Sequence, residues 1–473
     1  MNINLEDLAQ TLADRRWFGA KHRTIESLAV VDQVTASEGD PSLVLALIRI
    51  EFEDGGADVY HIPLLSREGE QLDAFDDVEQ LRVLGELLAH GASLHGSNGT
   101  FHFSGAGLNP LDPPGKRSIR ALGSEQSNSS IIFDDDVILK LFRRVENGSS
   151  PDLELNRMLT AQDSDFVPPH LGDLYYEGTL DDEDVSFDLA IAQRFVADGR
   201  DGWEHVLDEI RKLYDQIHPE DAREDIRFLI EERAGSSLAD IEDLGAASAA
   251  MHVALSREEE DVAFHPESMD DSDLKELVVG ATQLLRRQIE DGVEELVDLE
   301  PEICRKLEEL LDLNDPGAKI RIHGDYHLAQ VLWTLRGWRI LDFEGEPTRS
   351  LEERNEKQSP LKDAAGMLRS FGYAALSVLF ERAEPGTDEW RRLQPWADMW
   401  ERLARERFLG AYLGKSHEGR FLPPDRDEFF SLVHFFEIDK ALYEVGYERA
   451  HRPSWMRIPL RGIARLIDRE GTE

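Results

Sequence analysis

Two aspartates lie in a stretch that alternates strand-like and polar runs. Asp325 stands in HGDYH, and Asp342 stands in LDFEGE. The run AKIRIHGD is typical of a strand that enters a loop, and QVLWTL and WRILDF are typical of a hairpin joined by Arg336 and Gly337. We therefore expect the hairpin to bring Asp342 back beside the Asp325 loop, with Gln330 between them.

Two carboxylates and an amide at one place form an oxygen-rich site. Such hard ligands suit Mg²⁺ that is bound together with substrate phosphates. Protein kinases place a metal-binding amide about five residues after the base aspartate, and a second metal-binding aspartate on a later strand. Asp325, Gln330 and Asp342 have this order and spacing. They predict phosphoryl transfer, with Asp325 as the base and the other two as metal ligands.

The same loop leaves another interpretation open. His323, Asp325 and His327 stand at alternate positions, as a metal-hydrolase cluster could. Alternate positions in a loop are a weak zinc pattern, and no downstream ligand motif accompanies them. His323 on its own is typical of a packed, hydrogen-bonded loop residue.

A kinase also needs residues that hold the nucleotide, and candidates occur upstream. Lys140 lies in the apolar strand VILKLFRR, where a lysine is costly unless it is paired. The helix that begins at Pro151 offers Glu154 as the partner, and this pair would hold the α- and β-phosphates of ATP. The alternative is an edge-strand lysine whose ammonium reaches solvent. A non-catalytic pseudokinase that serves as a binding module is disfavoured, because such a protein would usually have lost at least one residue of this set.

A polar turn is the candidate phosphate loop. It reads SEQSNSS, positions 124–130, and lacks both the Walker A and the GxGxxG pattern. Its backbone N–H groups and hydroxyls could still cap phosphates, which would place Ser127, Asn128 and Ser129 at the nucleotide. On its own, the segment would be interpreted as a hairpin turn.

A second loop is the candidate adenine site. The apolar strand AIAQRFVADG, positions 190–199, ends in a loop at the expected junction between two lobes. The backbone from Arg194 through Phe195 to Val196 could hydrogen-bond the base. This signal is weak when it is taken alone.

These residues require several structural units around them. The 473 residues exceed one ordinary core. Positions 1–105 are expected to form a small α+β unit, followed by a Gly- and Pro-rich linker at 104–116. A β-rich unit is expected at 118–200. A helical unit is expected at 201–473, interrupted by the short strands of the aspartate stretch.

The composition indicates a cytoplasmic protein with an acidic coat. The formal net charge is -44, from 96 acidic and 52 basic residues, which argues against general nucleic-acid binding. The acidic residues are dispersed, as in DDEDV and SREEEDV, and this pattern favours a halophile's surface that stays hydrated in high salt. No apolar run is long enough for a membrane span, no signal peptide is evident, and Cys304 has no internal disulfide partner.

Several long motifs resemble one family along most of the chain, from about Arg16 to Leu460. They are similar to those of the maltokinases, in the aminoglycoside-phosphotransferase and choline-kinase-like branch of the kinase superfamily. The motifs are RWFGAKHR, EQSNSS, LKLFRR, PDLEL, HGDYHLAQVL, LDFEGEP, SPLKDAAGMLRSFGYAA and KALYEVGYERAHRPSWMRIPL.

The resemblance implies an α+β, bilobal, eukaryotic-kinase-like fold with an extra N-terminal cap domain. The cap would be 1–105, the β-rich N-lobe 118–200, and the helical C-lobe 201–473. It also implies ATP-dependent phosphorylation of maltose to maltose 1-phosphate, in the trehalose–maltose–glycogen route and with functional coupling to a trehalose synthase. Glucosamine kinases form a related branch with the same cap and core, so glucosamine is the alternative acceptor.

The resemblance also assigns roles to residues. Asp325 would be the catalytic base, and Gln330 and Asp342 would hold Mg²⁺. Lys140 would contact the ATP phosphates, with Glu154 orienting it. Polar residues near HGDYH, DFEGEP and the C-terminus are candidate sugar contacts or site-shaping residues: His323, His327, Glu344, Glu346, Arg354, Lys357, Tyr443, Glu444, Tyr447 and Glu448. The last four would share one side of a helix, where a core-facing tyrosine stripe with surface glutamates is the alternative.

Overall fold

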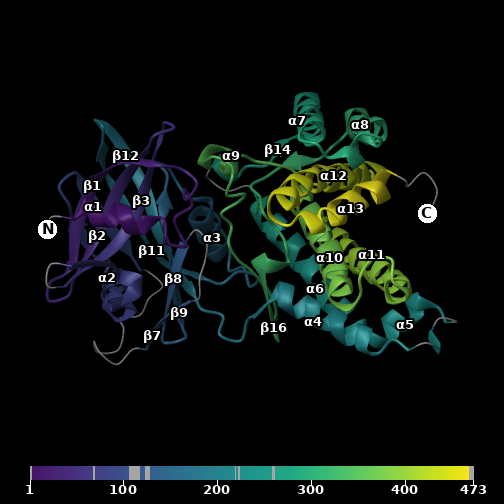
Figure 1. Ribbon diagram of the computed structural model, residues 1–473, viewed down its shortest axis with the longest axis horizontal. Coiled ribbons are helices and arrows are strands. Elements are labelled where there is room, and N and C mark those ends of the chain that lie inside the picture. Colours follow the sequence, from purple (N-terminus) through teal and green to yellow (C-terminus); the bar gives the residue numbers. More distant parts are fainter. Residues whose placement is uncertain are drawn as a thin grey trace. The chain divides into compact units, whose positions relative to one another are not determined.

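The chain divides into two compact units, and each is described by itself (Figure 1). Unit 1 comprises Met1–Asp163 and Val167–Ala197, and unit 2 comprises Ser164–Phe166 and Asp198–Glu473. The boundary expected at 200/201 lies close to this division. The computed structural model describes residues 3–67, 70–105, 118–122, 128–218, 220–221, 224–257 and 262–467.

The first sheet of unit 1 has a central strand that is apolar along most of its length. Strand β2 reads SLVLALIRIEF, and its side chains alternate between two cores. Leu43 and Leu45 pack into one core, whereas Ile48 and Ile50 pack into another that includes Trp17. The sheet has the order β1-β2-β3-β10, with β4 paired to β3. Its elements are β1 (Ile25–Ser37), β2 (Ser42–Phe52), β3 (Ala57–Arg67), β4 (Glu70–Asp73) and β10 (Arg144–Val145), with helix α1 (Leu5–Leu12).

The second sheet of unit 1 carries the strands of the expected nucleotide region. Its order is β5-β6-β11-β12-β9-β8-β7. Strand β6 pairs with β11, and β10 joins the first sheet through β3, so the segments 1–105 and 118–200 interleave within one unit. The elements are β5 (Ser93–His95), β6 (Gly99–Ser104), β7 (Ile119–Ala121), β8 (Asn128–Phe133), β9 (Val137–Phe142), β11 (His170–Leu180), β12 (Glu183–Arg194), α2 (Arg82–His90) and α3 (Pro151–Ala161).

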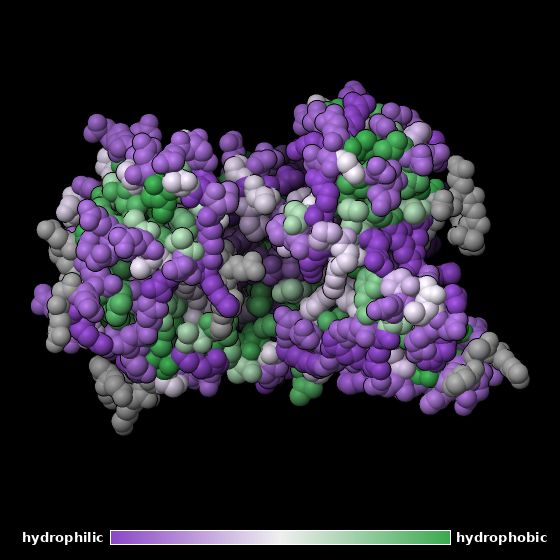
Figure 2. Space-filling model, in the orientation of Figure 1, coloured by the Kyte–Doolittle hydropathy of each residue, from purple (hydrophilic) through white to green (hydrophobic). Residues whose placement is uncertain are grey.

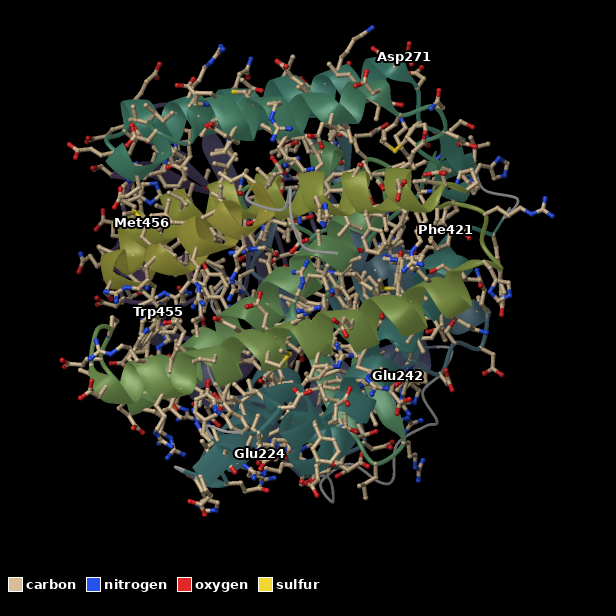
Figure 3. The ribbon with its side chains drawn as sticks, turned by 90° about the vertical axis from the view of Figure 1, so that its right-hand side faces the viewer. Glu224, Glu242, Asp271, Phe421, Trp455 and Met456 are labelled. Atoms are coloured by element: carbon tan, nitrogen blue, oxygen red, sulfur yellow. The ribbon has the colours of Figure 1, made fainter. Side chains whose placement is uncertain are left out.

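Unit 2 is built mainly from helices around α10 (Leu361–Arg382), which is buried over most of its length. Helices α4, α11, α12 and α13 pack against it. Figure 3 views the unit from the side of α7, α11 and α12; Asp271 marks the start of α7, and Phe421 lies in the connection between α11 and α12. The remaining helices are α4 (Gly202–Asp215), α5 (Ile226–Arg233), α6 (Gly235–Leu255), α7 (Asp271–Glu290), α8 (Glu300–Glu308), α9 (Leu351–Asn355), α11 (Asp388–Ser416), α12 (Arg426–His451) and α13 (Arg457–Ile467).

Short strands interrupt the helices of unit 2, and the expected hairpin is among them. Thr334 pairs with Gly337, so Leu335 and Arg336 form the turn, one residue earlier than expected. The strands are β13 (Arg200–Asp201), β14 (Glu267–Ser268), β15 (Ala318–Lys319), β16 (Val331–Thr334) and β17 (Gly337–Ile340). Among the described residues, the 3₁₀ turns are η1 (Ala74–Asp76), η2 (Val78–Leu81), η4 (Val262–Phe264), η5 (Glu294–Leu296), η6 (Glu309–Asp312), η7 (Leu328–Gln330) and η8 (Pro453–Trp455).

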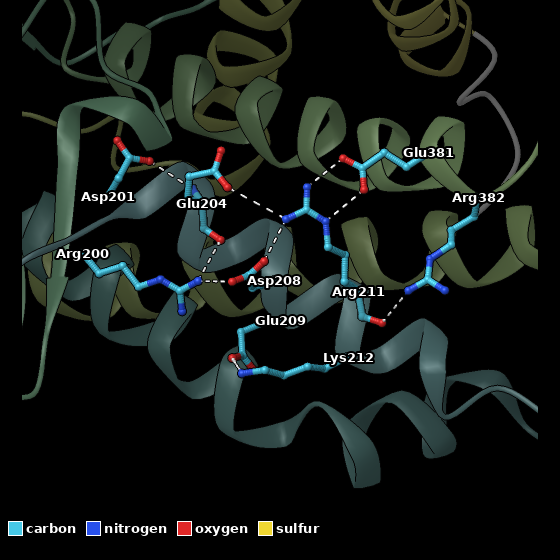
Figure 4. A network of polar contacts seen from close by, with 9 residues as sticks. All are labelled: Arg200, Asp201, Glu204, Asp208, Glu209, Arg211, Lys212, Glu381 and Arg382. Atoms are coloured by element: carbon cyan, nitrogen blue, oxygen red, sulfur yellow. Dashed lines mark hydrogen bonds and ion pairs between the residues drawn. The ribbon is translucent and has the colours of Figure 1, made fainter. Parts of the chain in front are cut away.

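Hydrophilic residues cover much of the face seen in Figure 2. Many acidic groups of the described residues pair with arginines. Around α4, for example, Arg211 contacts Asp208 at 2.8 Å and Glu381 at 2.7 Å, and Asp208 also pairs with Arg200 (Figure 4). Within the described ranges, no helix is both long and apolar enough to cross a membrane.

Helices α6 and α11 approach each other closely at Gly245, so we expect a side chain there to lower the stability of the protein. A Cβ at this position would lie 2.3 Å from the backbone oxygen of Phe408, which cannot swing away as a side chain can. Alanine favours a helix over glycine by up to about 1 kcal/mol, but overpacking costs about 1–3 kcal/mol. We expect Gly245→Ala to lower the free energy of unfolding, as measured by urea denaturation.

Gly410 supplies the matched control, because it also lies inside a helix, in α11. A Cβ there meets nothing within 4 Å. Gly410→Ala should therefore leave the free energy of unfolding unchanged or raise it by up to about 1 kcal/mol. Equal effects of the two substitutions would contradict the close helix contact at Gly245.

The net charge of -44 should make the thermal stability of the protein depend on salt. Added salt weakens the exposed ion pairs, but each of these contributes only about 0–1 kcal/mol. Salt also screens the repulsion among the excess carboxylates, and this effect involves the whole surface. We expect the Tm to rise between about 0.1 M and about 1 M KCl. A Tm that stays constant or falls in calorimetry would show that the pairs, not the excess charge, dominate.

Candidate active site

The loop that carries Asp325 lies against the loop that follows Asp342. Gly324 has a φ of 84° and Gly345 a φ of 73°. A Cβ added at Gly324 would lie 3.1 Å from the Cα of Gly345. Glycine tolerates both the backbone angles and the close approach. The two aspartate segments therefore converge as the sequence predicts.

One buried carboxylate holds the Asp325 loop. Asp363, in the first turn of α10, accepts the backbone N–H groups of His323 at 2.7 Å and Gly324 at 2.9 Å. Nε2 of the buried His252 lies 3.1 Å from the same carboxylate. Burial alone would raise the pKa of Asp363, but these partners outweigh it and hold the pKa below its ordinary value. Asp363 therefore remains a charged anchor for the loop.

His323 connects the two loops through both of its ring nitrogens. Its Nε2 donates to the carbonyl of Leu341 at 2.8 Å, its Nδ1 accepts the backbone N–H of Asp325 at 3.4 Å, and the side chain is 1% exposed. We expected a substrate contact here, but the ring is enclosed. Because both ring nitrogens are engaged, the geometry also disfavours the metal-hydrolase cluster.

Asp325 is half-buried, and an ammonium and an imidazole lie beside its two oxygens. Lys440 Nζ lies 3.2 Å from its Oδ1, and His327 Nε2 lies 3.6 Å from its Oδ2. His327 also accepts the N–H of Ala329 through Nδ1 at 3.2 Å, so in the neutral imidazole Nε2 is the protonated nitrogen. Burial would raise the pKa of Asp325, but His327 and Lys440 outweigh it and hold the pKa well below its ordinary value. Asp325 is therefore ionised at neutral pH.

Lys440 joins Asp325 to a second carboxylate. Its Nζ lies 3.3 Å from Oε2 of Glu346, and Oε1 of Glu346 accepts the hydroxyl of Tyr443 at 2.8 Å. Burial and the nearby Glu346 raise the pKa of Tyr443 to about 12, so its hydroxyl keeps the proton that it donates. The four side chains form a continuous chain of polar contacts, from Asp325 through Lys440 and Glu346 to Tyr443.

These four side chains border a cavity of about 750 Å³ in unit 2. Its other walls come from α7 and from the segments around β14, β15 and α10. Small-molecule sites usually have volumes of roughly 300–1,000 Å³. Ion pairs line the wall near β14: Lys319 with Asp273 at 2.7 Å, and Lys357 with Glu267 at 2.7 Å.

Gln330 and Asp342 lie at the open end of the hairpin. The N–H of Leu341 donates to the carbonyl of Gln330 at 2.9 Å, which places the two expected metal ligands on adjacent strand ends. Asp342 has a φ of 66°, an uncommon conformation for a residue with a side chain. Amide and carboxylate oxygens are ligands that Mg²⁺ prefers, so the donor set fits this ion.

The other expected sugar contacts divide between the cavity and its surroundings. Lys357 lines the cavity, and Arg354 Nη1 donates to the carbonyl of Glu344 at 3.1 Å, next to Gly345. Residues Glu344 and Arg354 are not among the described residues that line it.

The expected face of α12 separates in the same way. Tyr443 lines the cavity, whereas Glu444 pairs with the buried Arg369 at 2.7 Å. Glu448 pairs with Arg452 at 2.7 Å, and the 46%-exposed Tyr447 stacks on His451. Glu444, Tyr447 and Glu448 therefore do not belong to the described lining.

In unit 1, Lys140 has an acidic partner from the expected helix. Its Nζ lies 3.1 Å from Oδ2 of Asp152, which is 1% exposed. Asn156 Nδ2 donates to Asp152 Oδ1 at 2.8 Å, and Gln193 Nε2 donates to Asn156 Oδ1 at 2.9 Å. We expected Glu154 in this role; Asp152 lies two residues earlier in the first turn of α3, and Glu154, half-buried in the same turn, stays a predicted partner.

The expected phosphate loop is shorter than its sequence suggests. Ser127 lies outside the described residues, and β8 already begins at Asn128. Ser129 pairs with Leu141 in the sheet, so its side chain is on the face opposite to Lys140, where its Oγ accepts Arg143 Nε at 2.8 Å. Asn128 shares the face of Lys140.

The expected adenine site is partly occupied by the protein's own hydrogen bonds. The N–H of Arg194 donates to the carbonyl of Pro169 at 2.9 Å, and the N–H of Phe195 donates to that of Asp136 at 2.8 Å. These two groups are unavailable to a base. Val196 stays a prediction.

Sequence reasoning missed Lys440, Asp363, His252 and Asp152. Lys440 had a signal, because it precedes Tyr443 by three positions on one helix face. Asp363 and His252 had weak signals at best, since their partners lie 40 and 111 positions away.

Comparisons with known proteins show similarity to glucosamine kinases. A glucosamine kinase of Mycolicibacterium smegmatis is 30% identical over 156 residues, 32% of this chain and 35% of that protein. One from Streptacidiphilus jiangxiensis is 23% identical over 287 residues, 59% of this chain and 58% of that protein. The matches thus span about a third and somewhat over half of these relatives.

Solved structures show the same fold. A glucosamine kinase in complex with glucosamine, ADP and inorganic phosphate matches with a TM-score of 0.69 at 20% identity, over 98% of this chain and 100% of the other. Crystal form B of a glucosamine kinase gives a TM-score of 0.71, also at 20% identity, over 99% and 100%. The expected kinase-like fold with a cap domain is confirmed.

Two family models match the sequence. Residues 12–94 match the maltokinase N-terminal cap domain. Residues 118–396, more than half of the chain, match the phosphotransferase enzyme family. The family expected from the motifs is thereby confirmed, and the chain belongs to the phosphotransferase enzyme family.

Proposed function

We propose that this chain is an ATP-dependent sugar kinase, with Asp325 as the base that receives the acceptor hydroxyl. The observation that carries the proposal is an ionised Asp325 carboxylate on the wall of a cavity of about 750 Å³, held between Lys440 and His327. Family membership supports phosphoryl transfer, and the matched relatives are sugar kinases.

In this proposal the nucleotide is bound by a lysine that contacts its phosphates and by residues that hold its Mg²⁺. Lys140, held by Asp152, supplies a cation for the phosphates, with Glu154 and Asn128 nearby in the same unit. Gln330 and Asp342 would hold Mg²⁺, which neutralises phosphate charge when it is bound. The ADP complex of a structural relative supports ATP as the donor.

Asp325 would act mainly by orientation. A carboxylate with a low pKa is a weak base, but the transition state for phosphoryl transfer asks for little early deprotonation. A fixed carboxylate that accepts the hydroxyl's hydrogen bond supplies alignment of the nucleophile. The proton passes to Asp325 Oδ as the oxygen–phosphorus bond forms and the bond to the ADP oxygen breaks.

Maltose is the first acceptor that we propose, with maltose 1-phosphate as the product. The match to the maltokinase cap domain supports this choice, and the cavity volume leaves room for a disaccharide. A place in the trehalose–maltose–glycogen route, together with a trehalose synthase, belongs to the same proposal.

Glucosamine is the second candidate. The two relatives and the two solved structures named above are glucosamine kinases, and the carboxylates of Asp325 and Glu346 at the cavity could accept an ammonium group. Both acceptors use the same base and the same nucleotide residues, so only turnover can separate them.

The acceptor is tested by ADP release from ATP and Mg²⁺, with maltose, glucosamine, glucose or no sugar. We expect release that depends on maltose. Release that depends on glucosamine would retain the sugar kinase and replace the acceptor. Folded protein that releases ADP with none of the sugars would contradict the proposed function.

Removal of the base should affect turnover more than binding. We expect Asp325→Asn to lower kcat by about 10²–10⁴-fold and to leave KM for ATP nearly unchanged, because the carboxylate acts in the transition state. Initial rates of ADP formation measure both constants.

Asp388→Asn is the matched control, since this aspartate is 98% exposed at the start of α11. It should retain the parent kcat. An Asp325→Asn enzyme with an unchanged kcat would exclude Asp325 as the base.

A further inference from the structure

Lys440 has a position that neither packing nor the surface explains. Its Nζ lies between two carboxylates, 3.2 Å from Asp325 Oδ1 and 3.3 Å from Glu346 Oε2, on the wall of the cavity. A solvent-facing lysine would gain little from such pairs. An enclosed ammonium is stable only where carboxylates compensate for its lost hydration.

The position of Lys440 is itself fixed by two neighbours. Tyr443 lies one helical turn further along α12; its ring centroid is 5.0 Å from Lys440 Nζ, and its hydroxyl donates to Glu346 at 2.8 Å. Glu346 therefore has one oxygen on Lys440 and the other on Tyr443. Because Tyr443 holds Glu346, and Glu346 holds Lys440, the ammonium group is kept in position beside Asp325.

The charges leave a net negative cluster that suits a base. Lys440 neutralises one of the two carboxylates, so one negative charge remains between Asp325 and Glu346. Lys440 occupies Oδ1 of Asp325, and a carboxylate oxygen can accept more than one hydrogen bond. Asp325 can thus be held by the lysine and still accept a hydroxyl from the cavity.

We propose that Lys440 is a positioning residue of the phosphoryl transfer: it holds the Asp325 carboxylate ionised and oriented toward the acceptor cavity, and Glu346 and Tyr443 hold Lys440. The inference rests on the proposed function, in which Asp325 is the base. The role concerns orientation and charge, so removal of Lys440 should change kcat and the pH profile, whereas KM for ATP should change little.

Other charged groups surround this contact, and the test must separate them. His327 approaches Asp325 at 3.6 Å, and Glu444 is engaged by Arg369 at 2.7 Å. The charged or titratable groups described around Asp325, Lys440 and the neighbouring Lys362 are His323 and His327 on the Asp325 loop, Glu346 and Arg349 after β17, Asp363 in α10, and Asp439 and Glu444 in α12.

The test compares Lys440→Met, Lys440→Arg and the parent enzyme in acceptor-dependent ADP release across pH. Loss of the cation raises the pKa of Asp325, so less of it is ionised as the pH falls. We expect Lys440→Met to lower kcat by about 10–100-fold and to move the acidic limb of kcat up by about one pH unit or more. Lys440→Arg should restore the parent limb, because it keeps the charge.

Three further variants keep the test decisive. Lys415→Met, an exposed lysine paired with Glu418, is the matched control and should change neither constant. Glu346→Gln keeps Lys440 but loosens it, and should lower kcat less than Lys440→Met. In a His327→Gln background, Lys440→Met should still move the acidic limb of kcat to higher pH. Equal losses from Lys440→Met and Lys440→Arg with an unchanged pH profile would reduce Lys440 to a packing role and overturn the inference.

A readout without turnover separates this inference from the proposed function. In protein labelled with ¹³C at aspartate carboxyls, the signal lost in Asp325→Asn identifies Asp325. Its titration midpoint should rise in Lys440→Met, whether or not a sugar is phosphorylated. An unchanged midpoint would overturn the inference. Parent protein without sugar-dependent ADP release, together with a raised midpoint in Lys440→Met, would overturn the proposed function, whereas the effect of Lys440 on the Asp325 carboxylate would stand.

Discussion

The buried carboxylate of Asp363 is the constraint on which the candidate active site depends. A charge with 2% exposure is costly unless donors surround it, and here two backbone N–H groups and His252 do so. Asp363 lies in the first turn of α10, where the helix dipole also favours a negative charge. Because the backbone donors belong to His323 and Gly324, satisfying this charge fixes the conformation of the loop just before Asp325.

The conformation of the Asp325 loop then determines which segments can pack against it. Gly324 adopts a positive φ and comes so near to Gly345 that a side chain would fill the gap. His323 adds a hydrogen bond to Leu341, directly before Asp342. Asp325, the proposed base, and Asp342, the expected metal ligand, are thus placed by backbone contacts, and Lys440 adds the charge that only a side chain from another element can supply.

Local sequence signals predicted much of this site. The hairpin, the convergence of the two aspartates and the need of Lys140 for an acidic partner follow from strand patterns and from the cost of a buried cation. The contact of Lys140 with Asp152 does not, because Asp152 and Glu154 both stand in the first turn of α3 and only the packing of that helix brings the Asp152 carboxylate to the strand.

Other features depend on contacts that no local pattern contains. The N–H of Phe195 donates a hydrogen bond to the carbonyl of Asp136. Ser129 faces Arg143, because β8 begins earlier than the polar composition suggests. Similarly, Glu444 and Glu448 share a helix face with Tyr443 in sequence, but Arg369 and Arg452 engage them. Tertiary pairing, not spacing, separates the cavity wall from its supports.

The charge balance of the cavity differs from that of the whole chain. The protein has nearly twice as many acidic as basic residues, whereas the described cavity lining has six basic and eight acidic side chains. They are Arg287, Lys319, Arg349, Lys357, Lys362 and Lys440, with Glu267, Asp273, Glu276, Asp325, Glu346, Glu356, Asp363 and Asp439.

This near balance lets one chain combine a strongly acidic composition with a cavity of nearly balanced charge, which suits the proposed transfer of a phosphoryl group. Excess carboxylates on the surface repel one another through solvent, where dissolved ions screen them within about 10 Å or less. In the cavity, paired and partly enclosed charges such as Lys440 with Asp325 are screened much less. Added salt can therefore weaken the repulsion among surface carboxylates while it leaves the interactions around Asp325 nearly unchanged. The salt dependence of protein stability and that of the cavity charges can thus differ.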